Sequence, residues 1–385
     1  MDVKSYFFFY VLLSLFLSGC SKSESDSSVV NLDFTRNYDG VTLNLNDIAS
    51  DISVVRMETN ENSLISYYRG FVGDKYILSF GNKSIMLFSS DGKFIQTIIN
   101  RGKGPGEFNQ IDAWTVDDTE HFLYYHDAGK DYICRYDLSS RKPDKELPFT
   151  NKGYLSKMLL INDTTFAIMP GMFGKYGYHW FYQSISGKIL GGEEKESVPH
   201  PGGVWAGMSP LFIKLAYNTI FYQPSESDTL FRIKGVEKTP VFCFKYAPAK
   251  KNGSKTTGES VSILKTLKSR MLIRKSKFEK IVTSTSASIK GLGLDIYITD
   301  YSGSKINRID SVFYDKMGIW LDANLIQLTN DNMVTFIYNA VDFKTVLKNA
   351  INSKDISDVK RNSLSILNNE ISDDDNPIVI AGKLK

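Results

Sequence analysis

The sequence predicts an all-β fold, arranged as a six-bladed β-propeller, from its aromatic content and from a strand pair that recurs along the chain. Aromatic residues make up 13% of the 385 residues, whereas only 11 prolines occur. Aromatic side chains are enriched in strands. Apolar residues account for 42% and charged residues for 23%, so the chain can bury a core. The net charge of +3 is small and gives no reason to expect a nucleic-acid partner.

The first twenty residues have the pattern of an export signal. Lys4 precedes an apolar run from Tyr6 to Leu17, which is shorter than the about 20 residues that a transmembrane helix needs. The residues that follow, Ser18-Gly19-Cys20, complete a segment that resembles the bacterial lipobox. This resemblance implies cleavage after residue 19 and a lipid on Cys20. The alternative is an ordinary cleaved signal with a chance cysteine.

Three regions follow from this pattern. Residues 1–19 are expected to be a lipoprotein signal peptide, residues 20–45 a lipidated cysteine with a flexible tether, and residues 46–385 the propeller. The acidic residues shortly after Cys20 loosely resemble the surface-export signal of Bacteroidota lipoproteins. We therefore expect the lipid to anchor the protein to the outer membrane, on its periplasmic face or at the cell surface.

The strand pair recurs at a regular spacing. Three segments each hold an aromatic or β-branched strand, a polar turn with glycine and a second strand, and a fourth segment holds a weaker copy; they are residues 77–89, 125–137, 298–310 and 220–233. Their anchor positions are Ile85, Ile133, Leu230 and Ile306, separated by 48, 97 and 76 residues. The middle step is about twice the first, which places a degenerate copy at residues 178–182. Repeats of about 40–50 residues with several short strands are typical of β-propellers.

Five copies and two C-terminal strands together suggest six blades. The C-terminal strands are expected at residues 333–338 and 377–380, and residues 52–57 could complete the last blade. A strand from the N-terminal side in the last blade would close the ring and leave no open sheet edge.

Residues 85–95 and the glycine-rich run at 102–108 resemble NHL-type propellers. More closely, they resemble the six-bladed propeller lipoproteins of Bacteroidota, many of which have no assigned function. Met57-Glu58-Thr59 matches the opening of that group, and the acidic residues before Asn376-Pro377 match its closing strand. Arg56-Met57 departs from the Pro-Leu that the group favours at this place.

Residues 248–287 differ in composition from the rest of the chain. They carry ten lysine and arginine residues against two glutamates. Because apolar residues recur there at helical spacing, we expect a basic, helical insertion over residues 248–287. It could contact anionic lipid head groups or an acidic glycan, or be a solvated helix packed by its apolar stripe. A second, short C-terminal helix is expected at residues 355–371.

Carboxylates give the one indication of catalysis. Asp127 and Asp300 occupy matching places after the first strand of their repeats, and a lyase or glycan hydrolase at the central mouth would need at least two of Asp127, Asp300, His126 and His179 to converge. Aspartate after a strand is also ordinary turn chemistry. We therefore expect a non-catalytic protein, with the enzyme as the alternative.

No metal or cofactor site is expected from the histidine and cysteine spacing, because neither His-Glu-x-x-His nor Cys-x-x-Cys occurs. Calcium held by the acidic run at residues 373–375 is an unsupported alternative. Cys134 and Cys243 lie far apart in strand-like runs. They could form one bridge, but two buried free thiols fit the sequence better.

The function predicted from these features is a binding or scaffold module. Its rigid ring would present loops to a glycan, a peptide or a membrane-protein partner in the envelope. Three tryptophans are candidates for stacking on a sugar or side chain, although each could instead be a core residue: Trp114, Trp180 and Trp205.

Overall fold

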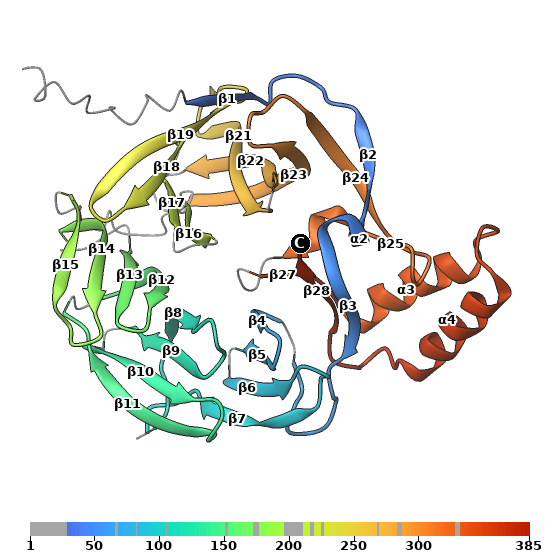
Figure 1. The fold of residues 1–385 in the computed structure, drawn as a ribbon, viewed down its shortest axis with the longest axis horizontal. Helices are drawn as coiled ribbons and strands as arrows, with labels where there is room; N and C mark the ends of the chain where they lie inside the picture. Colours follow the sequence, from blue (N-terminus) through green and yellow to red (C-terminus); the bar gives the residue numbers. More distant parts are fainter. Residues whose placement is uncertain are drawn as a thin grey trace, which may run out of the picture.

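In a computed structural model of the protein, the chain forms a ring of β-sheets around a central axis, with two helices at one side (Figure 1). The structure describes residues 29–385 apart from residues 66–67, 82, 105, 129, 151–152, 172–176, 196–210, 216–218, 225–226, 268, 283–286 and 328–331. The chain passes once around the ring, and each sheet is built mainly from consecutive strands. The prediction of a β-propeller is confirmed.

Three sheets are antiparallel meanders of four consecutive strands. The first comprises β4 (Gly70–Val72), β5 (Tyr76–Phe80), β6 (Ser84–Ser89) and β7 (Phe94–Asn100). The second comprises β8 (Ile111–Val116), β9 (Phe122–Asp127), β10 (Tyr132–Asp137) and β11 (Lys142–Pro148). The third comprises β12 (Leu155–Asn162), β13 (Thr165–Pro170), β14 (Tyr178–Ser184) and β15 (Ile189–Glu194). Strand β14 confirms the degenerate repeat predicted at residues 178–182.

Two further sheets each include a strand from the N-terminal region. In one sheet it is added to a four-stranded antiparallel meander, and in the other it is one of the four antiparallel strands. One consists of β16 (Leu211–Leu215), β17 (Thr219–Gln223), β18 (Thr229–Lys234) and β19 (Glu237–Lys245), and β1 (Val30–Asp33) joins β19 in parallel. The other consists of β26 (Ile326–Gln327), β27 (Met333–Tyr338), β28 (Ile378–Leu384) and β3 (Ala49–Arg56). Strand β3 pairs with β28 from Arg56–Ile378 to Ala49–Leu384, so the predicted closure of the ring is confirmed.

The sixth sheet differs from the other five. It has seven strands. Six of them are hydrogen-bonded neighbours in the order β2 (Gly40–Asn44), β24 (Ile306–Tyr314), β23 (Ala287–Asp300), β22 (Arg270–Val282), β21 (Lys255–Thr266) and β20 (Lys250–Asn252). The seventh, β25 (Ile319–Leu321), pairs with β24 outside this order. Its three central strands have 12, 13 and 14 residues, about twice the length of a typical strand.

The prediction of six blades is therefore wrong as stated. Five blades of the four-stranded form are present in the described part of the chain, not six. The spacing of the repeats misled the count, because the step of 76 residues between the last two anchors contains long strands that build the seven-stranded sheet.

The prediction of a helical insertion at residues 248–287 is wrong. The described residues of this segment form β20, β21, β22 and the start of β23. Val261 and Ile263 on β21 are buried and Ser262 between them is half-buried, the period of two that a strand requires. On β22, Met271 and Ile273 belong to one core cluster and Leu272 to another, so both faces of that strand are covered. The spacing of three to four residues among its apolar side chains was thus incidental.

The prediction of a flexible tether at residues 20–45 is also wrong for the residues from 30 onward. Strands β1 and β2 pair in parallel with β19 and β24, and the side chains of Leu32 and Phe34 are fully buried. Burial of these apolar side chains stabilises the docking of a segment that we expected to be solvated.

Four helical segments accompany the sheets in the described part of the chain. They are α2 (Leu45–Ile48), the short 3₁₀ turn η2 (Ala323–Leu325), α3 (Ala340–Ile351) and α4 (Asp358–Glu370). Helix α4 confirms the C-terminal helix predicted at residues 355–371, whereas α3 was not predicted. The buried side chains of α3, spaced three and four residues apart, include Phe343 and Leu347. None of the helices among the described residues has the length and apolar character needed to cross a membrane.

A buried asparagine fixes the junction between the closing strands. The side chain of Asn376, which is 3% exposed, donates to the carbonyl oxygens of Glu58 (2.6 Å) and Ser63 (2.7 Å). Its amide oxygen accepts from the backbone N–H of Ile65 at 2.7 Å. One side chain thus satisfies three backbone groups that lie more than 300 residues away in the sequence.

We expect Asn376→Ala to lower the free energy of unfolding by about 2–4 kcal/mol, because it leaves these buried backbone groups unpaired. Asn31→Ala is the matched control, since Asn31 is exposed and donates a single bond to the carbonyl oxygen of Val29. Its effect should stay within about 0.5 kcal/mol. Urea unfolding measures both values, and equal effects of the two substitutions would contradict the role of Asn376.

Candidate functional site

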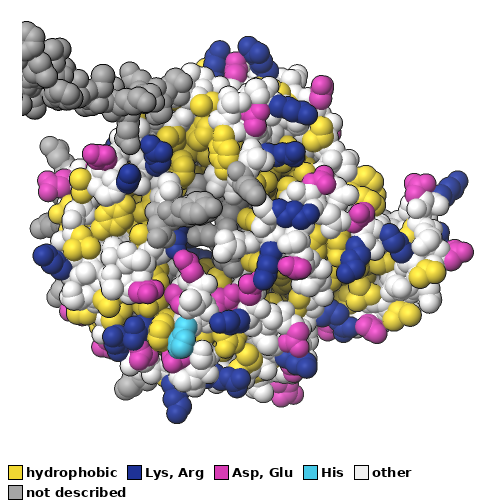
Figure 2. Space-filling model, viewed as in Figure 1, with side chains coloured by type: hydrophobic (Ala, Val, Ile, Leu, Met, Phe, Trp, Pro, Cys, Tyr) yellow, Lys and Arg dark blue, Asp and Glu magenta, His cyan; other side chains and the backbone are white. Residues whose placement is uncertain are grey.

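A cavity of about 410 Å³ lies on the axis of the ring. Its lining comes largely from the strand of each sheet that faces the axis, including β4, β8, β12, β16 and β21. Figure 2 shows the central hollow, with acidic and basic side chains bordering it. A volume of this size is typical of small-molecule sites.

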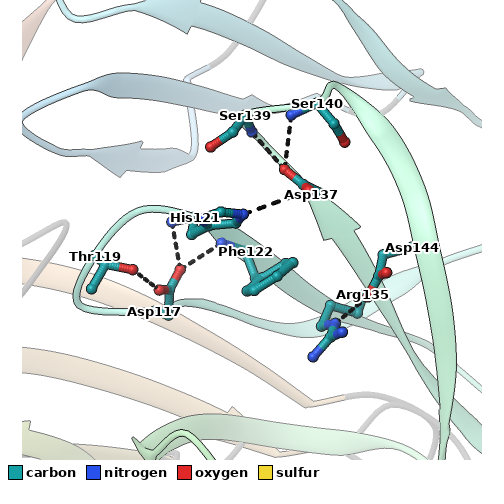
Figure 3. A network of polar contacts seen from close by, with 9 residues as sticks. All are labelled: Asp117, Thr119, His121, Phe122, Arg135, Asp137, Ser139, Ser140 and Asp144. Carbon is teal, nitrogen blue, oxygen red and sulfur yellow. Dashed lines mark hydrogen bonds and ion pairs between the residues drawn. The ribbon is translucent and has the colours of Figure 1, made fainter.

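The acidic part of the lining comes from two neighbouring turns. Asp117, Asp118 and Glu120 lie in the turn between β8 and β9, and Asp74 lies in the turn between β4 and β5. The carboxylate of Asp117 organises its own turn by accepting from the backbone N–H groups of His121 (2.8 Å) and Phe122 (2.5 Å) (Figure 3). Such local bonds are why aspartate is common in turns.

Glu120 joins two sheets at the edge of the cavity. Its side chain is 7% exposed, and its carboxylate accepts from the backbone N–H groups of Lys75 (2.8 Å), Tyr76 (3.0 Å) and Asp74. A Cβ atom on Gly73 would lie only 2.4 Å from the Glu120 carboxyl carbon, so a larger residue there would displace the carboxylate. Glu120 thus holds the turn of the preceding sheet in place.

Lysines from other sheets pair with two of these acids. The Nζ atom of Lys214 on β16 lies 2.9 and 3.0 Å from the carboxylate oxygens of Asp118, and that of Lys383 on β28 lies 3.0 Å from Asp74. The bond to Asp74 raises the pKa of Lys383. The Lys214 side chain is 10% exposed, whereas that of Asp118 is 72% exposed, so the carboxylate remains accessible.

Trp114 adds an aromatic surface to the cavity wall. It lies on β8, is half-buried, and stacks on Phe80 with 4.3 Å between the ring centroids and 14° between the planes. Apolar residues such as Ile213 and Leu264 complete the lining. The cavity therefore presents carboxylates, ammonium groups and one supported indole ring within a single space.

Of the other two predicted tryptophans, Trp180 is not at this site. Trp180 on β14 is fully buried, and its Nε1–H donates to Glu193 at 2.9 Å, which makes it a core residue. Trp205 lies outside the described residues.

The predicted carboxylates take part in turns. Asp127 is buried and accepts from the backbone N–H groups of Asn109 and Gln110 at 2.8 to 3.2 Å. Asp300 accepts from Ser304 and Ser302, and the Ser304 hydroxyl is the main cause of its lowered pKa. The two aspartates lie on different sheets, and neither lines the axial cavity.

The predicted histidines are not brought to the cavity either. His126 is fully buried, with Nδ1 2.7 Å from a carboxylate oxygen of Asp112 and Nε2 3.1 Å from the Lys130 carbonyl oxygen. Burial is the main cause of the lowered pKa of His179 on β14. The structure thus assembles no pair of these residues at the axial cavity.

His121 belongs to a surface network beside the cavity. Its Nε2 atom lies 3.5 Å from the carboxylate of Asp137, which also accepts from the backbone N–H groups of Ser139 and Ser140 (Figure 3). The bond from Ser140 is the main cause of the lowered pKa of Asp137. Asp137 therefore acts as a turn residue as well.

The two cysteines within the described residues, Cys134 and Cys243, are free thiols, as predicted, but both are half-buried and not buried. Burial is the main cause of the rise of the Cys134 pKa to about 11. Within the described part of the chain, no group of three or more His, Cys, Asp or Glu side chains is placed to hold a metal ion. In the acidic run at 373–375, Asp373 pairs with Lys344 at 2.6 Å.

Sequence reasoning missed the charged residues of the cavity. Glu120, Asp118, Lys214 and Lys383 carry no motif, because their partners lie in other sheets. The one available signal was the acidic turn at residues 117–120, which has three carboxylates in four residues.

Comparisons with known proteins give a family and a fold. A family model described as a domain of unknown function, DUF4934, matches residues 28–383. No curated protein matches the chain. Among solved structures, one described as a candidate exported protein of Bacteroides fragilis NCTC 9343 has a TM-score of 0.60 and 14% identity, covering 93% of this chain and all of that one. This likeness agrees with the propeller fold.

Two other solved structures are more distant. The β-propeller domain of Cps50 (Swd1) from Myceliophthora thermophila has a TM-score of 0.36 and 10% identity, covering 70% of this chain and 95% of that chain. Hydrazine synthase of Kuenenia stuttgartiensis has a TM-score of 0.38 and 10% identity, covering 84% of this chain and 90% of that chain.

We expect Glu120→Gln to lower the free energy of unfolding by about 1–3 kcal/mol. The amide nitrogen that replaces one carboxylate oxygen cannot accept, so at least one backbone N–H at the edge of the cavity loses its partner. Glu61→Gln is the matched control, since Glu61 is exposed, and it should change the value by less than about 0.5 kcal/mol. Denaturant unfolding tests both, and a neutral Glu120→Gln would show that the turn is held by other contacts.

Proposed function

We propose that this chain, which belongs to the DUF4934 family of domains of unknown function, is a non-catalytic envelope lipoprotein that binds a glycan in the axial cavity. The observation that carries this proposal is the presence of Trp114 and two ion pairs in the lining of one cavity.

The aromatic ring gives the first argument. Sugars present apolar C–H faces that pack on aromatic rings, and an indole that is already supported from behind loses little freedom on binding. Phe80 provides this support for Trp114. Because the Trp114 ring is half-buried, it keeps surface that a ligand can cover.

The ion pairs give the second argument. Each sugar hydroxyl can donate one hydrogen bond and accept others, so neighbouring hydroxyls fit a carboxylate and an ammonium group placed side by side. The pairs Asp118–Lys214 and Asp74–Lys383 have this arrangement. Charge-assisted hydrogen bonds of this kind are about twice as strong as neutral ones.

The envelope location rests on the N-terminal segment. Its apolar run and the Cys20 that ends it resemble a lipoprotein signal, and one propeller similar to this chain is described as exported. The resemblance of residues 85–108 to NHL-type propellers of Bacteroidota lipoproteins supports the same placement. In this role, the protein holds its ligand at the outer membrane.

The enzyme alternative has no comparable support. The enzyme would need at least two of four residues, Asp127, Asp300, His126 and His179, to converge at the central mouth. None of the four lines the axial cavity. A peptide or a membrane-protein partner at the cavity is an outcome that the binding experiment below can detect.

We expect Trp114→Ala to weaken glycan binding about tenfold, because stacking on the indole is lost. A glycan array probed with the purified protein identifies the ligand, and calorimetry measures its affinity. Trp320→Ala is the matched control: Trp320 is 54% exposed, lies on β25, and is absent from the cavity lining. Absence of any glycan ligand, capture of a peptide instead, or equal effects of the two substitutions would overturn the proposal.

We expect Cys20→Ala to release the protein from membranes, since the lipid is attached at this residue in the proposed mature form. Cell fractionation together with metabolic labelling by a fatty acid measures the effect. Cys134→Ala is the control and should leave both retention and label unchanged. Retention of the Cys20→Ala protein without lipid label would show that the anchor lies elsewhere.

A further inference from the structure

The seven-stranded sheet extends well beyond the length of a blade. Strands β21, β22 and β23 stay paired from the propeller core outward, with one register shift in each of the two ladders. Gly258 lies opposite Phe278, and Phe278 lies opposite Gly291. The inner halves of β21 and β22 contribute buried side chains such as Ile263 and Ile273 to the core. The outer halves form a surface of their own.

A second cavity, of about 550 Å³, lies on one face of this outer part. Its lining includes Arg274 and Phe278 from β22, and Ile289 and Leu294 from β23. Ser260 and Ser276, which are opposite each other in register, add two hydroxyl groups. The wall is thus mainly apolar, with two cationic side chains, Arg274 and Lys277, and hydroxyls beside it.

Glycines create the open space beside Phe278. A Cβ atom on Gly258 would lie 2.9 Å from the Phe278 ring, so the ring lies over this glycine on β21. On the other side, a Cβ atom on Gly291 would meet no atom within 4 Å. An open slot therefore lies above Gly291, which is opposite Phe278, and Leu294 lines the same cavity.

Arg274 is the unusual group in this cavity. The residue is half-buried, and its Nε atom is shielded from solvent and has no hydrogen-bond partner among the described residues. Burial lowers the pKa of its guanidinium, yet arginine stays protonated at neutral pH. A shielded N–H without a hydrogen-bond partner is costly, so an anion that accepts from Arg274 would remove a penalty that the free protein bears.

The neighbouring lysines differ from Arg274 because they already have acidic partners. Lys275 lies 3.1 Å from Glu259, Lys255 lies 2.6 Å from Glu279, and Lys277 lies 3.9 Å from Asp295. Among the described residues, these carboxylates serve the lysines and none of them pairs with Arg274.

We propose that this cavity binds an amphiphilic anion, with the single anionic head, a carboxylate or a phosphate, against Arg274 and the apolar tail in the slot above Gly291. The planar guanidinium fits the oxygens of either head, and the hydroxyls of Ser260 and Ser276 can donate to them. Phe278, Ile289 and Leu294 cover the tail. This site is separate from the axial cavity and does not depend on the glycan proposal.

Calorimetry with dodecanoate and dodecyl phosphate below their micelle concentrations tests the proposal. The protein is the chain from residue 20 with Cys20→Ser, which contains every described residue and needs no detergent. At least one of the two anions should bind with a stoichiometry of one, and dodecanol should bind at least about tenfold more weakly. The two anions also distinguish a carboxylate head from a phosphate head.

Two variants locate the site. Arg274→Met should weaken binding about tenfold or more, whereas Arg270→Met, an exposed arginine on the same strand, should leave it unchanged. Gly291→Leu should block binding with Arg274 still present, and Gly291→Ala should reduce it less. Circular dichroism checks that each variant is folded.

Several results would overturn the proposal. These are no binding of either anion, equal binding of dodecanol, or equal effects of Arg274→Met and Arg270→Met. Unchanged binding by a folded Gly291→Leu variant would also overturn it. Loss of glycan binding at the axial cavity would not, because none of the residues of this second cavity lines the first.

Discussion

The pairing of β3 with β28 is the interaction on which the rest of the structure depends. It joins a strand near residue 50 to one near residue 380 and completes the sheet that closes the ring. Three residues of the axial cavity, Met333, Lys383 and Leu384, come from this sheet, so the cavity exists only once the ring is closed. Asn376 reinforces the junction from within, since its amide reaches the backbone of the segment that follows β3. The pairing also covers the edge of β28, which would otherwise be open to pairing with other chains.

Local sequence patterns predicted the parts of the fold that repeat. The strand pairs around Ile85, Ile133 and Ile306 have alternating apolar residues and turn residues at equivalent places, and such patterns determine strands directly. The segment at residues 248–287 was misread because apolar residues such as Val261 and Leu264 also fit a helical period. Its burial follows Val261 and Ile263 instead, and that choice is made by the sheet against which they pack. Docking of Leu32 and Phe34 likewise depends on a distant strand.

The candidate site could be predicted only in small part. Trp114 was identified by residue type, and the alternative interpretation of Asp127 and Asp300 as turn residues agrees with their hydrogen bonds. The charged pairs were not visible, because Lys214 meets Asp118 across 96 positions in the sequence and through a contact between sheets. In a ring of sheets, the residues around the axis are neighbours through closure rather than through spacing. No local motif could therefore reveal them.

The seven-stranded sheet shows how one element can serve both stability and binding. The inner parts of β21 and β22 are fixed by the burial of Val261, Ile263, Met271 and Ile273. Arg274 directly follows the buried Ile273, and the pairing continues beyond it, past one register shift in each of the two ladders, to the outer parts that line the second cavity. An unpaired charge can persist there only because the strand that carries it is held elsewhere. A loop of the same sequence would turn the guanidinium to water and lose the site.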